Sequence, residues 1–293
     1  MKNENFNRVF VGSGLVAEIF LHALIRHKGE SPDDFYILGK NVERCDQLMK
    51  KYQIRATTNF NAFISKAKVV VLAVDITDLN DISDIVKKIH DKIPDNALIA
   101  SVTPSLKIEQ IEKFFPDHPV MRLTLNLSAI SGNNIGTYCC GSVAPRDTAL
   151  MAKYLIESIG NLIEVKNEKE FENIWKMIFA QSTLAYVAIN CMIAATIKAG
   201  FTPEQARQVS TNVFKSTAET FNQKYKDDLM RRSFEYKNIF NYGLDLAKEY
   251  GLMDIIGQSL NMKPEKLQED LKRIHQMDAA AEEEKYEFHY RGW

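Results

Sequence analysis

The chain has 293 residues, with 37 Lys and Arg against 38 Asp and Glu and a formal net charge of -1. This length predicts two domains or one large domain, and it excludes the peptide-hormone and disulfide-scaffold classes. The balanced charge excludes the basic surface of a general nucleic-acid binder. The 4 cysteines include no C-x-x-C pair, so we expect reduced thiols in a cytoplasmic protein and no metal site.

A glycine motif follows the first apolar run. Residues 8–11 predict a short strand, the next six residues fit the pattern G-x-G-x-x-A, and residues 18–27 predict a helix. Small residues in such a turn let backbone N–H groups approach a pyrophosphate at the start of the helix. A tight turn without a ligand is the alternative. The motif predicts a dinucleotide site formed by Gly12, Ser13, Gly14, Leu15 and Val16.

The end of the second predicted strand, residues 35–38, distinguishes between cofactors. An Asp or Glu at that position binds the ribose hydroxyl of NAD and repels a 2′-phosphate. Here the chain continues Gly39-Lys40-Asn41, and Arg44 follows one helical turn later. These side chains offer donors and positive charge to a phosphate, although they could also be ordinary solvated residues. The pattern favours NADP(H), held by Lys40 and Asn41.

The following segments predict the rest of an N-terminal domain. The uniformly apolar run at residues 69–74 is typical of a central parallel strand covered by helices on both faces. Further strands are expected at residues 98–102, 120–123, 136–140 and 162–165, with helices at residues 79–93, 107–115 and 146–159. This alternation predicts an α/β fold class, a Rossmann-type doubly wound parallel sheet over residues 1–168.

The remaining residues, 169–293, predict an all-α C-terminal domain for substrate binding and dimerisation. No strand pattern occurs there, and the helices are interrupted at Gly200, Gly243, Gly251 and Pro264. The sequence Thr202-Pro203-Glu204-Gln205 is a capping box that begins a helix extending to about residue 224.

One segment, residues 177–197, contains no charged residue and is long enough to span a bilayer. Its several polar residues are too many for a lipid-facing helix, so we expect no membrane span. Ser182, Tyr186 and Asn190 are spaced four apart and share one helical face. We expect this helix to be buried at a dimer core, with its polar face lining the active site. A purely structural polar network is the alternative.

Four later segments correspond, in order, to family motifs. Residues 71–75 are similar to A-V-K-P, residues 99–103 to V-S-I-A, residues 121–129 to R-x-M-P-N-T-P-A, and residues 182–186 to part of G-S-G-P-A-Y. With the glycine motif, they make residues 8–221 resemble the Δ1-pyrroline-5-carboxylate reductases of the 6-phosphogluconate-dehydrogenase-like superfamily. The resemblance implies cofactor contacts by Ala73, Val74, Ser101 and Asn126.

The differences from this family's motifs bear on the expected substrate and not on the expected fold. Asp75 replaces the family lysine, Leu125 replaces the proline before Asn126, and the family segment P-G-G-T-T has no counterpart at residues 222–262. In the related β-hydroxyacid dehydrogenases, the position of Tyr186 carries a catalytic Lys, whereas imine reductases often have Tyr or Asp there.

Imine reduction needs one proton at nitrogen, which a neutral phenol can donate, whereas alcohol oxidation needs a stronger base. We therefore predict an NADPH-dependent oxidoreductase that reduces a C=N bond of a small-molecule substrate and acts as a homodimer. Its expected catalytic residues are Tyr186, Asn190 and Ser182. A β-hydroxyacid dehydrogenase-like enzyme and a non-catalytic NADP-binding dimeric protein are the alternatives.

Overall fold

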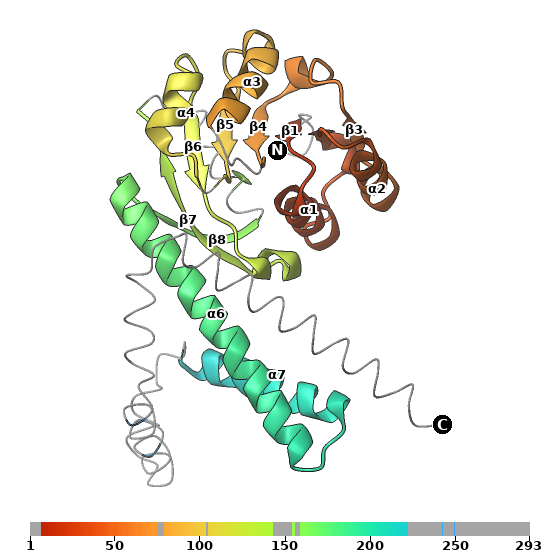
Figure 1. Ribbon diagram of the computed structural model, residues 1–293, viewed down its shortest axis with the longest axis vertical. Helices are drawn as coiled ribbons and strands as arrows, with labels where there is room; N and C mark the ends of the chain where they lie inside the picture. The colour runs from red at the N-terminus through yellow and green to blue at the C-terminus, as the bar shows by residue number, and fades with distance from the viewer. Residues whose placement is uncertain are drawn as a thin grey trace. The chain divides into compact units, whose positions relative to one another are not determined.

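The computed structural model describes residues 7–74, 79–103, 105–142, 154–155 and 159–221, together with residues 242 and 249 (Figure 1). The chain divides into two compact units, residues 1–179 and residues 180–293. The division falls inside one helix, α6 (Glu168–Lys198), which begins where the sequence predicts the second domain. Each unit is described by itself below.

The described residues of the first unit form an eight-stranded sheet of order β3-β2-β1-β4-β5-β6-β7-β8. Its strands are β1 (Arg8–Val11), β2 (Phe35–Leu38), β3 (Arg55–Thr57), β4 (Val69–Leu72), β5 (Leu98–Ser101), β6 (Val120–Leu123), β7 (Asn134–Cys140) and β8 (Gly160–Glu164). All neighbouring pairs from β3 to β6 are parallel, which confirms the expected α/β fold class.

The described helices alternate with the strands as expected. They are α1 (Leu15–Leu21), which continues as a π-helix over His22–His27, α2 (Val42–Tyr52), α3 (Leu79–Ile89), α4 (Ile108–Phe114), α6 and α7 (Pro203–Phe221). Short 3-10 turns occur at Pro32–Asp34, Ile64–Lys66, His90–Lys92 and Leu127–Ser131. Most of the helix expected at residues 146–159, and everything expected beyond residue 221, lies outside the described ranges.

Two hydrophobic clusters cover the two faces of the sheet. One combines Phe10 with residues of α1 and α2, such as Phe20 and Leu48. The other combines Val9 and Val11 with residues of α3 and α4. Successive side chains of β1 thus enter opposite cores, because side chains alternate across a strand. This explains why the central strand β4 is apolar at every position.

The sheet departs from the expected all-parallel arrangement at its far edge. β7 pairs antiparallel with β6, and β8 then runs parallel to β7. A parallel return requires a crossover of a dozen or more residues, usually with a helix. The connection between Leu123 and Asn134 contains only a 3-10 turn, so the chain returns antiparallel.

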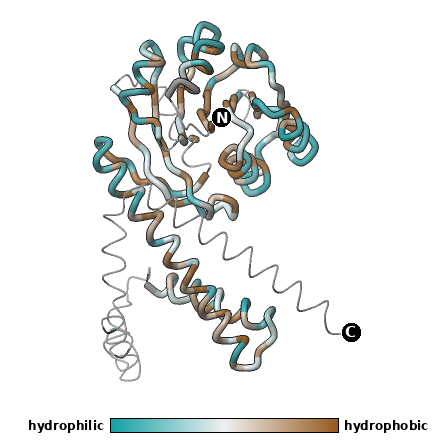
Figure 2. Tube along the Cα trace, in the orientation of Figure 1, coloured by the Kyte–Doolittle hydropathy of each residue, from teal (hydrophilic) through white to brown (hydrophobic). Residues whose placement is uncertain are grey.

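The described part of the second unit consists of α7 and the greater part of α6. Hydrophobic residues recur along α6 (Figure 2), and it is the one described helix long and apolar enough to cross a membrane by length and composition. Several of its large side chains are exposed within one chain, including Tyr186 and Val187. The expected burial of this helix is therefore not provided by the described residues of a single chain, and burial at a dimer core stays a prediction.

Candidate functional site

The candidate site lies where the direction of the sheet's connections reverses. β1 is central and pairs with β2 on one side and with β4 on the other. Consecutive strands therefore extend the sheet first in one direction and then in the other. In open α/β sheets, ligands bind beyond the carboxyl ends of the strands at this reversal. Gly12 follows β1 there and Ala73 follows β4, and the Ala73 N–H donates to the Val11 carbonyl at 2.9 Å.

Gly12 and Gly14 have opposite surroundings. A Cβ at Gly12 would lie 2.3 Å from the Ala73 carbonyl oxygen, and its φ of +123° disfavours any side chain. A Cβ at Gly14 would meet nothing within 4 Å. Because Gly12 has no side chain, the ends of β1 and β4 can lie close together, whereas Gly14 leaves open space before α1. This is the room that a close-lying phosphate requires, so the residues present fit a dinucleotide.

Ser13 lies between these glycines and faces the end of β2. It is buried, and a Cβ added at Gly39 would lie 2.6 Å from its Oγ and 2.9 Å from the Cys45 Sγ. Burial raises the pKa of the Cys45 thiol, so the thiol is neutral at physiological pH and acts as packing. The glycine loop is thereby packed directly against the start of α2.

Lys40 and Asn41 occupy the connection from β2 to α2. The Asn41 side chain caps α2, its Oδ1 accepting the Arg44 backbone N–H at 2.9 Å. Its amide NH₂ makes no hydrogen bond within the described part of the chain. Lys40 is exposed and has no polar partner among those same residues. Both side chains can therefore offer donors to a ligand at this edge of the sheet.

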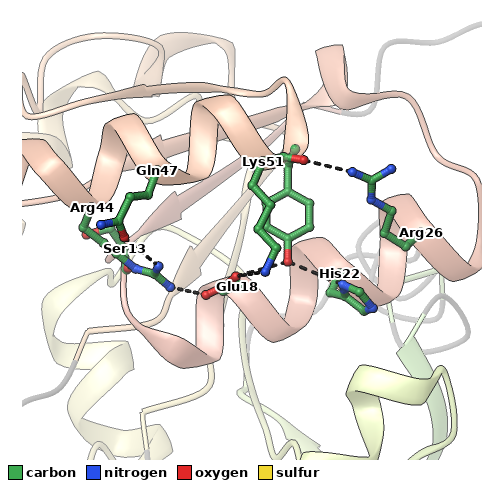
Figure 3. Close-up of polar contacts among 8 residues, drawn as sticks. Ser13, Glu18, His22, Arg26, Arg44, Gln47 and Lys51 are labelled. Carbon is green, nitrogen blue, oxygen red and sulfur yellow. Dashed lines mark hydrogen bonds and ion pairs between the residues drawn. The ribbon is translucent and has the colours of Figure 1, made fainter.

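Arg44, which the sequence offers as a third phosphate contact, has protein partners instead (Figure 3). Its Nε donates to the Ser13 carbonyl at 3.1 Å, one terminal nitrogen to Gln47 at 3.2 Å, and the other to Glu18. Sequence reasoning missed Glu18. Glu18 lies in the first turn of the helix after the glycine motif, and this position is a signal that the sequence contains. An acidic group so close to the expected anion site needs a nearby cation that compensates its charge.

The loops after β4, β5 and β6 carry the remaining cofactor candidates. Thr103, which sequence reasoning missed, joins two of them. Its Oγ1 donates to the Val74 carbonyl at 3.0 Å, and its N–H donates to Ser101 Oγ at 3.3 Å. Asn126 Oδ1 accepts the Ser128 N–H at 3.0 Å, so its side chain also holds its own loop. Ala73, Val74 and Asn126 thus follow strand ends, and Ser101 is the last residue of β5, all on the same edge as Gly12.

The three catalytic candidates lie together in the second unit. Ser182, Tyr186 and Asn190 share an exposed face of α6, and 62% of the Tyr186 surface is accessible within one chain. Asn190 Nδ2 donates to the Tyr186 carbonyl at 2.9 Å. This bond leaves Asn190 Oδ1 and the Tyr186 hydroxyl available as polar groups on one surface.

Groups of His, Cys, Asp or Glu that could hold a metal ion do not occur among the described residues. The expected sites are therefore two sets of residues, each described in its own unit. One set surrounds the glycine loop, and the other lies along α6.

The sequence is similar to those of known oxidoreductases. Residues 8–104 match a family model described as NADP oxidoreductase coenzyme F420-dependent. A pyrroline-5-carboxylate reductase of Synechocystis is 25% identical over 71% of this chain and 76% of its own length. Pyrroline-5-carboxylate reductase 2 of Bacillus subtilis is 27% identical over 68% of this chain and 70% of its own length.

Solved structures show the same fold. A pyrroline-5-carboxylate reductase from Coxiella burnetii has a TM-score of 0.73 at 17% identity, covering 88% of this chain and 97% of that one. The Plasmodium falciparum pyrroline carboxylate reductase, solved with NADP bound, has a TM-score of 0.71 at 16% identity with the same two coverages, 88% and 97%.

Proposed function

Because sequence and fold both support a pyrroline-5-carboxylate reductase-like family, we propose that this chain is an NADPH-dependent oxidoreductase that reduces the C=N bond of an imine. The observation that carries the proposal is the glycine loop at the sheet reversal, with open space beside Gly14. The similarity to a reductase solved with NADP supports the choice of cofactor.

The residues around the glycine loop would hold the cofactor. The backbone from Gly12 to Val16 would bind the pyrophosphate, and Lys40 and Asn41 would bind the 2′-phosphate. The loops after β4, β5 and β6 would hold the nicotinamide half through Ala73, Val74, Ser101 and Asn126. When bound, NADPH supplies the hydride that reduces the imine carbon.

The residues of α6 would serve the substrate. The Tyr186 hydroxyl donates a proton to the imine nitrogen, and Ser182 and Asn190 orient the substrate by hydrogen bonds. The exposure of Tyr186 and the Asn190 bond to the Tyr186 carbonyl support these roles, since both leave polar groups open on one face. The protein would act in the cytoplasm as a homodimer in which a second copy covers α6 and α7.

Titration with NADPH and with NADH, followed by nicotinamide fluorescence, tests the cofactor. We expect both to bind and NADPH to bind at least tenfold more tightly, because a charged contact to the 2′-phosphate contributes roughly 1.5–3 kcal/mol. Binding of neither nucleotide would refute the enzyme proposal. Tighter binding of NADH would refute the role of Lys40 and Asn41.

A substrate panel tests the chemistry. Pyrroline-5-carboxylate and other cyclic imines are supplied with NADPH, and 3-hydroxy acids with NADP. We expect turnover of an imine, with kcat falling about a hundredfold in Tyr186→Phe because the proton donor is lost. Tyr242→Phe, the same change at another exposed tyrosine, should leave kcat unchanged. Turnover of hydroxy acids alone would contradict imine reduction, and an unaltered kcat in Tyr186→Phe would remove Tyr186 from the mechanism.

A further inference from the structure

We propose that Arg44 is a positioning residue that fixes the peptide group between Ser13 and Gly14, and that it acts equally on NADPH and NADH binding. The inference rests on the proposed function, because it concerns the same dinucleotide site. It assigns Arg44 a role different from that of Lys40, although both are cations near the end of β2.

The contacts of Arg44 are those of a strut between α2, the glycine loop and α1. The Nε–H reaches the Ser13 carbonyl at 3.1 Å, while a terminal nitrogen is paired with the Glu18 carboxylate (Figure 3). The other terminal nitrogen donates to Gln47, one turn further along α2, at 3.2 Å. All three guanidinium nitrogens therefore already have protein acceptors. A planar guanidinium can satisfy these directions together, whereas a lysine ammonium cannot span them.

Both ends of the strut are themselves fixed. The Arg44 backbone N–H donates to the capping Asn41 side chain at 2.9 Å, so α2 begins at a defined position. On the other side, Glu18 also accepts from Lys51 Nζ at 2.7 Å and from the Tyr52 hydroxyl at 3.3 Å. Burial alone would raise the pKa of Glu18, but the hydrogen bonds from Lys51 and Arg44 outweigh it and lower the pKa. The carboxylate is therefore charged at neutral pH and holds Arg44 firmly.

The bond from Arg44 to the Ser13 carbonyl also determines the direction of the next backbone N–H. In a planar trans peptide, the C=O of one residue and the N–H of the next point in opposite directions. Because the Ser13 carbonyl is held by Arg44, the Gly14 N–H is directed away from Arg44. Gly14 is also the residue beside which a Cβ would meet nothing within 4 Å. Arg44 thereby turns a backbone donor to the side of the glycine loop away from Arg44, beside a residue with open surroundings, where a pyrophosphate shared by both nucleotides would bind.

Three variants separate this role from direct phosphate binding. Arg44→Gln removes the strut. Lys51→Gln is the matched control, since it removes a cation from the same Glu18 carboxylate without touching the glycine loop. Lys40→Gln removes the proposed 2′-phosphate contact. Dissociation constants for NADPH and NADH are measured by fluorescence titration for each variant. Exchange of the Gly14 amide hydrogen is measured with saturating NADPH.

We expect Arg44→Gln to weaken NADPH and NADH binding by the same factor, about tenfold, which corresponds to about 1.4 kcal/mol. With saturating NADPH, the Gly14 amide should exchange faster in that variant than in the unmodified protein, because its N–H is less firmly directed at the pyrophosphate. Lys51→Gln should weaken both nucleotides much less than Arg44→Gln does, because Arg44 keeps its own bonds to Ser13 and Glu18. Lys40→Gln should weaken only NADPH. If Arg44→Gln does not fold, Arg44→Lys replaces it, and the same equal weakening is expected because lysine cannot reach all three acceptors.

Other results of these measurements would overturn the inference about Arg44. Weakening of NADPH alone in the Arg44 variant would make Arg44 a phosphate ligand and overturn the inference. Unchanged affinities, or an equal effect of Lys51→Gln, would overturn it as well. If the unmodified protein binds neither nucleotide, the proposed function itself fails, which is a separate outcome from any difference between variants.

Discussion

Gly12 and Gly14 lie two residues apart in the same loop but have different roles. Gly14→Ala puts a methyl group into open space at an ordinary φ of −76°, so the fold should keep its free energy of unfolding within about 0.5 kcal/mol. NADPH binding should nevertheless weaken at least tenfold, because the methyl group obstructs a close-lying phosphate. Urea unfolding and fluorescence titration on the same sample check both expectations.

Gly12→Ala should show the reverse order of effects. The added Cβ would lie 2.3 Å from the Ala73 carbonyl oxygen at a φ of +123°. We expect the free energy of unfolding to fall by roughly 3 kcal/mol, since backbone strain and overpacking combine. An alanine variant at Gly12 that unfolds at the same urea concentration as the unmodified protein would contradict this account of the strand ends.

His118 links the stability of the first unit to pH. Burial lowers its pKa, and its Nδ1 is buried without a hydrogen bond in the described part of the chain. The unfolded state therefore takes up a proton at higher pH than the folded state does. The contribution of His118 is fully present above its unfolded pKa of about 6.5 and decreases as the pH falls below it.

Urea unfolding at about pH 7.5 and about pH 5.5 checks this prediction. The loss of stability on acidification should be smaller in His118→Asn than in the unmodified protein, because asparagine does not take up the proton. An equal loss in both proteins would show that His118 does not contribute.

At the residue scale, the sequence predicts those features of the site that depend on residues close together in the chain. Gly12, Gly14 and the absence of an acid after Leu38 are local signals, and they predict the cofactor class. The pairing of Glu18 with Arg44 joins residues on two helices. It depends on how α1 and α2 pack on the sheet, which no local pattern encodes.

The first turn of α6 is anchored to the sheet by a largely buried ion pair. Glu168 pairs with Arg122 of β6 through one carboxylate oxygen, and the other accepts the Ile108 N–H of α4 at 2.6 Å. The Arg122 guanidinium also lies 4.3 Å from the centre of the Phe171 ring. One carboxylate therefore joins a strand, a helix start and α6.

Removing this carboxylate's charge should cost more than the same change elsewhere on the helix. Glu168→Gln leaves a buried guanidinium partly uncompensated, and we expect the free energy of unfolding to fall by roughly 3 kcal/mol. Glu172→Gln, which affects only a surface pair with Lys176 at 3.8 Å, should change it by less than about 1 kcal/mol. Comparable losses in the two variants, measured by urea unfolding, would argue against the anchor.

Among elements, short and mostly apolar runs are predicted best. The strands at Phe35–Leu38 and Val120–Leu123 have the bounds that the sequence predicts. β3 was missed because Arg55–Thr57 is short, partly exposed and carries a charged residue. The antiparallel direction of β7 depends on the length and course of the connection before it, so its own residues do not reveal it.

For the whole molecule, the exposed apolar surface of the second unit leads to a prediction about assembly. Large hydrophobic side chains of α6 and α7, including Val187, Ile197, Val209 and Val213, are each at least 40% exposed within one chain. Light scattering in buffer without detergent should therefore give the mass of a dimer, about twice 33.5 kDa. A monomer under these conditions, or a requirement for detergent, would contradict the proposed homodimer.

The continuous course of α6 limits where the protein can be cut. The two compact units meet between Phe179 and Ala180, yet the helix runs unbroken from Glu168 to Lys198. Cleavage at that boundary would leave about four carbonyl groups at the new helix end without hydrogen-bond partners. The boundary also lies within a helix, so it offers no loop that a protease could cleave. A recombinant fragment that carries the sheet should therefore extend to Lys198.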